Sequence, residues 1–368
     1  MALAASLQQH DPEGVLWVLG LDEFTSDYLR NLRDPKIHVV ALSELEQADD
    51  GLHAVKAERS RVEYYFTLSP CWPRYLLQAN PTIPCITYVD ADMFWFASPS
   101  SVLSELEGAS ILVTEHRHPP HLAHHRRFGQ FNVGLVAFRN DEKGLACLDW
   151  WRERCLEWCY DRLEVEKYAD QKYLDTWPAL FGSALHIVQR CGINLAPWNW
   201  SQYHYETRGG QLLVDGEPIE LYHFARFRPT RGTWWFQSGQ LEYGVMPWTV
   251  RQYLYGNYWQ ALVKARERIQ QQHPDFDFVP KSARGWHQFW RAIGPRILFG
   301  SDWLRLGSTF ISGRFGFGRF SGVVMSWLRT RMKPAEHRSL SADSCPPMAL
   351  VKSEGYLPQT SSSDLPGG

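Results

Sequence analysis

Two aspartates, Asp90 and Asp92, directly follow the apolar run 85–89. A run this short between polar segments predicts a buried strand, and side chains two residues apart at a strand end project the same way. Two carboxylates in this arrangement repel each other unless a cation lies between them. The pattern therefore predicts a divalent metal site, whereas a bare Asp-x-Asp triplet without the strand is usually part of a solvated loop.

Short apolar runs alternate with helical patterns around this candidate site. The alternation is typical of an α/β sheet with crossover helices. The predicted strands are 15–19, 37–41, 85–89, 111–114 and 133–138. The predicted helices are 61–79, with an interruption near Pro70 and Pro73, and 142–160. Open α/β sheets bind ligands beyond the carboxyl ends of their strands, which is where the aspartates stand.

A histidine lies near the end of another predicted strand. Residues 211–214 and 219–224 flank Asp215-Gly216, a dipeptide that favours two-residue hairpin turns. The pattern predicts a β-hairpin that delivers His223 at the end of its second strand.

The composition excludes several classes of protein. The 368 residues include 38 Lys+Arg and 40 Asp+Glu, a formal net charge of −2, which argues against a dedicated nucleic-acid binder. With 44% hydrophobic residues, the chain can build a sizeable core. The seven cysteines show no paired spacing, and the sequence shows neither a secretory signal nor an uninterrupted spanning segment, so we expect a reducing cytoplasm. The 17 tryptophans suit either sugar stacking or core packing.

Five motifs occur in a fixed order along about residues 3–265. They are ITYVDADMFWFASP (86–99), FNVGLVAFRND (131–141), ADQKYLDTWP (169–178), GINLAPWNW (192–200) and LYHFARF (221–227). In this order and spacing the chain resembles bacterial nucleotide-sugar glycosyltransferases of the GT-A fold and is similar in layout to the retaining enzymes of family 8. The resemblance implies a mixed α/β sheet flanked by helices and transfer of a sugar, most simply from a UDP-sugar, to a polysaccharide or lipid-linked acceptor.

The resemblance also assigns metal ligands. Asp90 and Asp92 match the metal-binding Asp-x-Asp motif, and His223 matches the late histidine that completes the site. An imidazole ligand shifts the preference from Mg²⁺ toward Mn²⁺. The alternative for His223 is a histidine that only forms hydrogen bonds at a strand end.

Further residues match the family's donor and sugar contacts. Arg226 and Arg228 stand where the family places a cation on the diphosphate, unless they are solvated surface charges. Asn132 matches an amide that contacts donor or acceptor sugar, and Asp170 and Gln171 match a pair near the sugar hydroxyls and the anomeric carbon. Asp170 could instead cap a helix. These three are the expected catalytic residues.

Two other groups are less specific. Asn194, Trp198 and Trp200 suit an acceptor wall or core packing equally. The connector between the strands 111–114 and 133–138 is rich in histidine, which favours a mobile polar loop near the acceptor over a second metal site. Its histidines are His116, His118, His121, His124 and His125.

The first residues depart from the family pattern. They resemble the second half of the family's first helix followed by its second strand, so the first strand, which grips the nucleotide base, is missing. Because a sheet without a central strand leaves backbone groups unpaired, we expect a late start in the gene model. The alternative is a sugar-binding protein without transfer activity. A nucleotidyltransferase is a third interpretation, although no Gly-rich loop marks one.

The resemblance implies an N-terminally truncated glycosyltransferase domain over 1–272, and the composition adds a basic helical extension over 273–333 and a disordered tail over 334–368. Residues 280–334 hold ten Lys or Arg and one acid, Asp302. Such a segment suits peripheral contact with the inner face of the cytoplasmic membrane. The alternative is a basic helix packed on an acidic domain.

Overall fold

The chain forms two compact units. The computed structural model describes residues 1–106, 108–229, 236–238, 243–278 and 347–351. The first unit comprises Met1–Phe224 and Ser344–Gly368, and the second comprises Ala225–Asp343. The predicted basic segment 280–334 lies outside the described residues, so its helical and membrane-contacting character stays a prediction.

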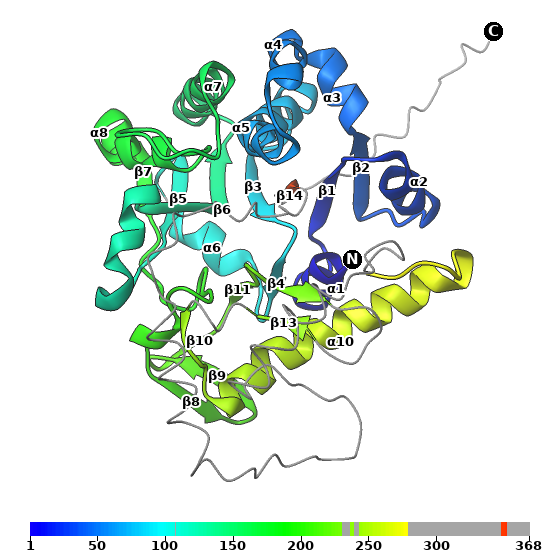
Figure 1. Cartoon of the computed structure of the whole chain (residues 1–368), viewed down its shortest axis with the longest axis vertical. Helices are drawn as coiled ribbons and strands as arrows, with labels where there is room; N and C mark the ends of the chain where they lie inside the picture. Colours follow the sequence, from blue (N-terminus) through cyan, green and yellow to red (C-terminus); the bar gives the residue numbers. More distant parts are fainter. Residues whose placement is uncertain (107, 230–235, 239–242, 279–346, 352–368) are drawn as a thin grey trace, which may run out of the picture. The chain divides into compact units, whose positions relative to one another are not determined.

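A seven-stranded mixed sheet forms the centre of the first unit, in the order β2-β1-β14-β3-β6-β5-β7 (Figure 1). β1 runs parallel to β2 and β5 runs parallel to β7, while the other neighbours are antiparallel. The strands are β1 Val15–Gly20, β2 Ile37–Ala41, β3 Cys85–Asp90, β5 Ile111–Glu115, β6 Phe131–Arg139, β7 Leu185–Ile187 and β14 Pro347–Val351. The predicted mixed α/β sheet flanked by helices is confirmed.

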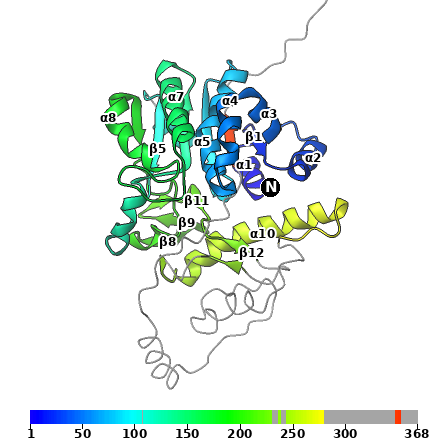
Figure 2. The same cartoon turned by 45° about the horizontal axis from the view of Figure 1, so that its top comes forward.

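Helices α3, α4, α5 and α7 lie beside the sheet (Figure 2). Capping side chains fix where two of them begin: Ser60 accepts from the backbone of Glu63 at the start of α5, and Asp141 accepts from Gly144 at the start of α7. The helices and helical turns of the first unit are α1 Ala2–His10, α2 Glu23–Asn31, α3 Leu42–Ala48, α4 Asp50–Val55, η1 Lys56–Glu58, α5 Arg61–Ala79, α6 Ser100–Glu105, η2 Pro120–Phe128, α7 Glu142–Glu157, η3 Lys172–Thr176, α8 Trp177–Phe181, η4 Gly182–Ala184 and η5 Trp200–Gln202.

Small sheets complete both units. In the first unit β4 Met93–Trp95 pairs with β11 Leu221–His223, and β8 Tyr205–Arg208, β9 Gln211–Val214 and β10 Glu217–Pro218 form a meander. The second unit contains β12 Arg228–Pro229, β13 Phe236–Gln237 and α10 Trp248–Gln272. No helix among the described residues is both long and apolar enough to cross a membrane.

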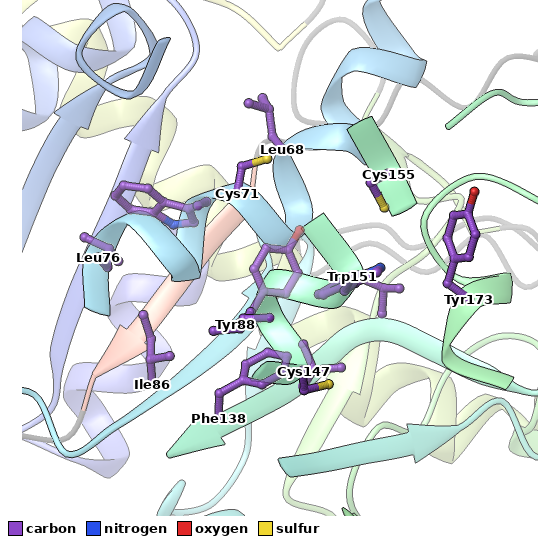
Figure 3. Close-up of a cluster of buried hydrophobic side chains, with 14 of the residues drawn as sticks. Leu68, Cys71, Leu76, Ile86, Tyr88, Phe138, Cys147, Trp151, Cys155 and Tyr173 are labelled. Carbon is purple, nitrogen blue, oxygen red and sulfur yellow. The ribbon is translucent and has the colours of Figure 1, made fainter. Parts of the chain in front are cut away.

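The core lies between the sheet and helices α5 and α7. Side chains from β3, β6 and these two helices pack together there (Figure 3). Trp72, Trp95, Trp151 and Trp177 are fully buried, so core packing accounts for these four tryptophans.

Helix α5 runs unbroken through Pro70 and Pro73, so the predicted interruption is wrong. Each proline removes one backbone hydrogen bond. Both are buried, as are Leu68, Trp72 and Leu76 between them and around them. We infer that burial of this face offsets the lost bonds, because tertiary packing supplies most helical stability.

The predicted hairpin forms only in part. β9 pairs with β10 around Asp215-Gly216, whereas β11, which carries His223, pairs with β4. The turn chemistry was readable from the sequence. The change of partner was not, because it depends on packing against residues 93–95.

A strand from the end of the chain occupies a central position in the sheet. β14 lies between β1 and β3, antiparallel to both (Figure 1). It falls within the predicted disordered tail 334–368, and this expectation is corrected for residues 347–351. The predicted gap in the sheet is thereby filled, since β14 gives the facing edges of β1 and β3 backbone partners.

Candidate metal centre

The turn after β3 carries both predicted carboxylates. β3 is buried up to Val89, and Asp90 ends it. Residues 91–92 then lead into β4, whose three residues are buried. Two rigid strands therefore fix the backbone on either side of Asp90 and Asp92.

β11 brings His223 to the same place. His223 stands opposite Met93 of β4, and its backbone N–H donates to the carbonyl of Leu195 at 2.7 Å. The N–H of Phe224 donates to the carbonyl of Asp92 at 2.8 Å. Backbone contacts thus hold the histidine between the 192–200 segment on one side and the aspartate turn on the other.

The three side chains converge. Nε2 of His223 lies 3.1 Å from Oδ1 of Asp92 and 3.7 Å from Oδ2 of Asp90. One ligand atom from each residue lies within 4.8 Å of the other two. In the part of the chain that the structure describes, these three metal-ligating side chains are close enough together to hold one metal ion.

Gly134 of the FNVG motif makes room for the histidine ring. A Cβ at this position would lie 2.7 Å from Nδ1 of His223 and 2.7 Å from Oδ1 of Asn132. Real Cβ atoms are not found this close to other atoms, so a larger residue would displace the ring. The glycine is needed for close approach of β6 to the metal centre.

The electrostatics of the cluster favour a cation. Burial raises the pKa of Asp90 to about 6; the nearby His223 opposes this rise and the charge of Asp92 adds to it. Burial alone would lower the pKa of His223, but the two carboxylates raise it above its ordinary value. The side chains of Asp90, Asp92 and His223 are 28%, 20% and 7% exposed. Two carboxylates and one imidazole nitrogen in this setting fit a divalent ion such as Mn²⁺ or Mg²⁺.

A chain of buried polar groups connects Asp90 with Asp170. The hydroxyl of Tyr88 donates to Oδ1 of Asp90 at 3.0 Å and lies 3.5 Å from Oγ of Ser69. Burial raises the pKa of Asp170 to about 7; a hydrogen bond with Ser69 lowers it and the charge of Asp90 raises it. The charge of Asp170 therefore depends on the metal centre. No pattern in the sequence marks Ser69 or Tyr88 for this role.

Asp170 does not cap a helix. The next helical turn, η3, starts at Lys172, and Gln171 occupies its N-cap without a side-chain capping bond. Asp170 is 5% exposed, and its carbonyl accepts a hydrogen bond from Nε1 of Trp151 at 2.9 Å. Nε2 of Gln171 donates to the carbonyl of Phe128 at 2.9 Å, which joins this loop to the end of η2.

Asn132 lies in a buried amide network. Its Oδ1 accepts from the N–H of Gly134 at 3.0 Å and from Nδ2 of Asn194 at 3.1 Å. Its Nδ2 lies 3.4 Å from Nε2 of His116. Asn194 adopts a left-handed backbone with φ of 59° and also donates to Thr114 at 2.7 Å. The network links β5, β6 and the 192–200 segment beside the metal centre.

The histidine-rich connector is ordered as a stack of rings. His116 stacks on His118 at 5.0 Å, and Trp198 lies edge-on to both His116 and His223. Burial lowers the pKa of His116 to about 3 and that of His118 to about 4, so both rings are neutral at pH 7. Residues 120–128 form the 3₁₀ segment η2, and the mobility expected for this connector stays a prediction. Trp198 is buried while Trp200 is partly exposed.

Arg226 and Arg228 belong to the second unit. Arg226 has a left-handed φ of 64°, and Arg228 stands opposite Gln237 in the β12–β13 pair. Their contact with a diphosphate stays a prediction.

This chain is similar in sequence to two bacterial proteins. No protein-family model matches it. It is 32% identical to "Uncharacterized protein YfnF" of Bacillus subtilis (strain 168) over 238 residues, 62% of this chain and 77% of YfnF. It is 28% identical to "Uncharacterized protein YfnD" of the same strain over 292 residues, 77% of this chain and 91% of YfnD. The chain belongs to the family of YfnF.

A solved structure is also similar. The apo crystal structure of mouse xyloside xylosyltransferase 1 matches 60% of this chain and 89% of its own chain, with 16% identity and a TM-score of 0.37.

Proposed function

We propose that the chain is a metal-dependent glycosyltransferase of the GT-A type. It transfers a sugar from a nucleotide diphosphate sugar, with a UDP-sugar as the first candidate, to a glycan or lipid-linked acceptor. The observation that carries the proposal is the convergence of Asp90, Asp92 and His223 at the carboxyl end of β3. The five ordered motifs of the sequence support it independently.

The residues of the centre have distinct roles in this proposal. Asp90, Asp92 and His223 would hold a divalent ion, which would supply positive charge to offset the negative charge that develops on the leaving group. Asp170 and Gln171 orient the sugar hydroxyls. Asn132 contacts the donor or acceptor sugar. Arg226 and Arg228 bind phosphate oxygens.

Turnover with a panel of UDP-, GDP- and dTDP-sugars plus Mn²⁺ tests the function. We expect release of a nucleoside diphosphate that stops with EDTA and falls at least about a hundredfold in Asp92→Asn, by analogy with the loss of one electrostatic contact in other active sites. Asp27→Asn, an exposed substitution on α2, is the matched control. Metal-dependent nucleotide binding without turnover would instead identify a sugar-binding protein. Release of pyrophosphate would identify a nucleotidyltransferase.

The stereochemical outcome follows from the same proposal. Resemblance to family 8 favours retention of the anomeric configuration, with Gln171 beside the anomeric carbon. NMR of the product anomer measures it, and an inverted product would remove this role from Gln171.

A cytoplasmic location at the membrane surface is the accompanying proposal for residues 280–334. Liposome flotation of the full chain with anionic vesicles tests it. Recovery should fall between about 0.1 and 1 M salt, as the screening length drops from about 10 to 3 Å. Recovery that is unchanged by salt would contradict an electrostatic contact.

A further inference from the structure

β14 is attached to the sheet from both sides by backbone pairing. Val15 to Val18 of β1 stand opposite Val351 to Met348, and Ile86 to Asp90 of β3 stand opposite Val351 to Pro347. Since β14 is antiparallel to both neighbours, β1 and β3 are parallel to each other. Their facing edges form a slot one strand wide, which we call the β1–β3 slot.

The two strands that border the slot come from a different part of the chain than the strand that fills it. β1 and β3 come from the first 90 residues, whereas the whole second unit, Ala225–Asp343, separates β14 from Phe224. The strand therefore docks as a segment that is remote along the chain. An open slot would leave two rows of N–H and C=O groups unpaired in the middle of the sheet, so it binds a strand strongly.

The sequence of the segment suits such docking. Residues 345–351 read CPPMALV and carry no charge. Affinity for a strand added to a sheet comes mainly from main-chain hydrogen bonds. The same segment of another copy offers identical bonds in identical register.

We propose that the β1–β3 slot is an interaction surface for a second copy of this chain, which supplies its own residues 347–351 as the central strand. Exchange of an identical element between copies is a low-cost route to dimers, because no new interface has to be formed. Residues 225–346 alone join Met1–Phe224 to the docked strand along the chain, so a strand that leaves one slot can enter that of a neighbour. Docking within one chain has the advantage of effective concentration. Exchange therefore grows with protein concentration.

Cysteine pairs distinguish the two modes of docking. Val15 and Val351 stand directly opposite each other on β1 and β14. Full-length Val15→Cys and full-length Val351→Cys, each with its own affinity tag and with Cys191→Ser and Cys345→Ser, are mixed and oxidised. A disulfide between the two tagged chains forms only when the strand of one occupies the slot of the other.

Two controls complete the experiment. The double variant Val15→Cys/Val351→Cys reports docking within one chain. Leu350→Cys replaces Val351→Cys as the matched register control, because neighbouring residues of a strand point to opposite faces. A second pair, Trp17 with Ala349, are also direct partners and give an independent site if either valine variant folds poorly.

We expect the disulfide between chains to increase with protein concentration in the Val15/Val351 and Trp17/Ala349 mixtures. The Leu350→Cys mixture should stay at background. Light scattering of the unmodified chain should show a dimer over the same concentrations. Formation of the disulfide within the double variant alone, at every concentration, would overturn the proposal. So would the absence of a disulfide in all variants, since β14 would then not occupy the slot.

Discussion

Tyr88 lies under the candidate metal centre, and its hydroxyl donates to Oδ1 of Asp90. Partners that orient a metal ligand typically change metal affinity by about 10- to 100-fold when they are removed. We predict that Tyr88→Phe weakens Mn²⁺ binding by about this factor, because the carboxylate of Asp90 loses a fixed orientation. Electron paramagnetic resonance of free Mn²⁺ during titration measures the affinity.

Tyr75→Phe is the matched control for this substitution. Tyr75 lies on α5, is partly buried against the same hydrophobic core and has no described bond to a metal ligand. Equal Mn²⁺ affinity in Tyr88→Phe and Tyr75→Phe would show that the Tyr88 hydroxyl does not position Asp90.

Asp170 predicts a pH dependence of stability. Its pKa is raised from 3.8 to about 7 in the folded chain. A raised pKa in an acid means that the folded state holds its proton more tightly, so the stabilisation is fully present below about pH 4 and is lost as the pH rises to about 7. Because asparagine does not ionise, Asp170→Asn removes this fall in folding stability with rising pH. We predict that the variant gains stability relative to the native chain, by up to about 1.4 kcal/mol per pH unit across this window.

Urea unfolding at pH 5 and pH 7.5 checks this prediction. Only the difference between Asp170→Asn and the native chain matters, because other groups titrate equally in both. Asp27→Asn should follow the native chain at both values. A difference that is the same at both pH values would contradict a buried, proton-binding Asp170.

The sequence predicted some of these residues and not others, for a physical reason. Asp90 and Asp92 are visible because spacing along one strand fixes their relative directions. His223 was visible as a residue at a strand end, and the family resemblance placed it at the metal. The resemblance also placed Asp170 near the sugar, but nothing in the sequence linked it to Ser69 and Tyr88. These three residues come from a loop, a helix and a strand. Their contact depends on how these pack, which no local pattern encodes.

At the scale of elements, strand existence was easier to predict than strand partners. The apolar runs at 15–19 and 85–89 identify β1 and β3 because burial on both faces requires continuous apolar sequence. β14 was missed because its five residues stand in a segment rich in Ser, Pro and Gly. Its strand conformation follows from the unpaired edges of β1 and β3, which are remote in sequence.

The docking of β14 gives a prediction about backbone protection. Ala349 stands opposite Trp17 on one side and Tyr88 on the other. Ala349→Pro removes a backbone N–H from the middle of the strand and should undock it, since proline is not tolerated in a central strand. We expect faster amide exchange in β1 and β3 but unchanged exchange in β5 and β6, as measured by hydrogen–deuterium exchange mass spectrometry.

Ala349→Val is the matched control, because it keeps the N–H and has a higher strand propensity than alanine. It should leave protection of β1 and β3 intact. If amides of β1 and β3 exchange equally slowly in Ala349→Pro and Ala349→Val, protection of these strand edges does not depend on residues 347–351.

At the scale of the molecule, the metal centre joins parts of the chain that are far apart. Asp90 and Asp92 follow β3, and His223 stands next to the last residue of Met1–Phe224. The two aspartates repel each other, and β11 and its partner β4 are each only three residues long. A cation shared by all three residues therefore opposes unfolding of the first unit at both of these positions.

Mn²⁺ should accordingly stabilise the native chain. A ligand that binds only the folded state adds about 2.7 kcal/mol at a concentration of about one hundred times its Kd. We predict that Mn²⁺ raises the midpoint of thermal unfolding, that EDTA reverses the rise, and that His223→Ala abolishes it. His186→Ala removes a histidine of β7 that is paired with Glu105 of α6, and this variant should respond to Mn²⁺ like the native chain. Equal stabilisation of His223→Ala and His186→Ala would show that Mn²⁺ binds elsewhere, and the proposed centre would have to be abandoned.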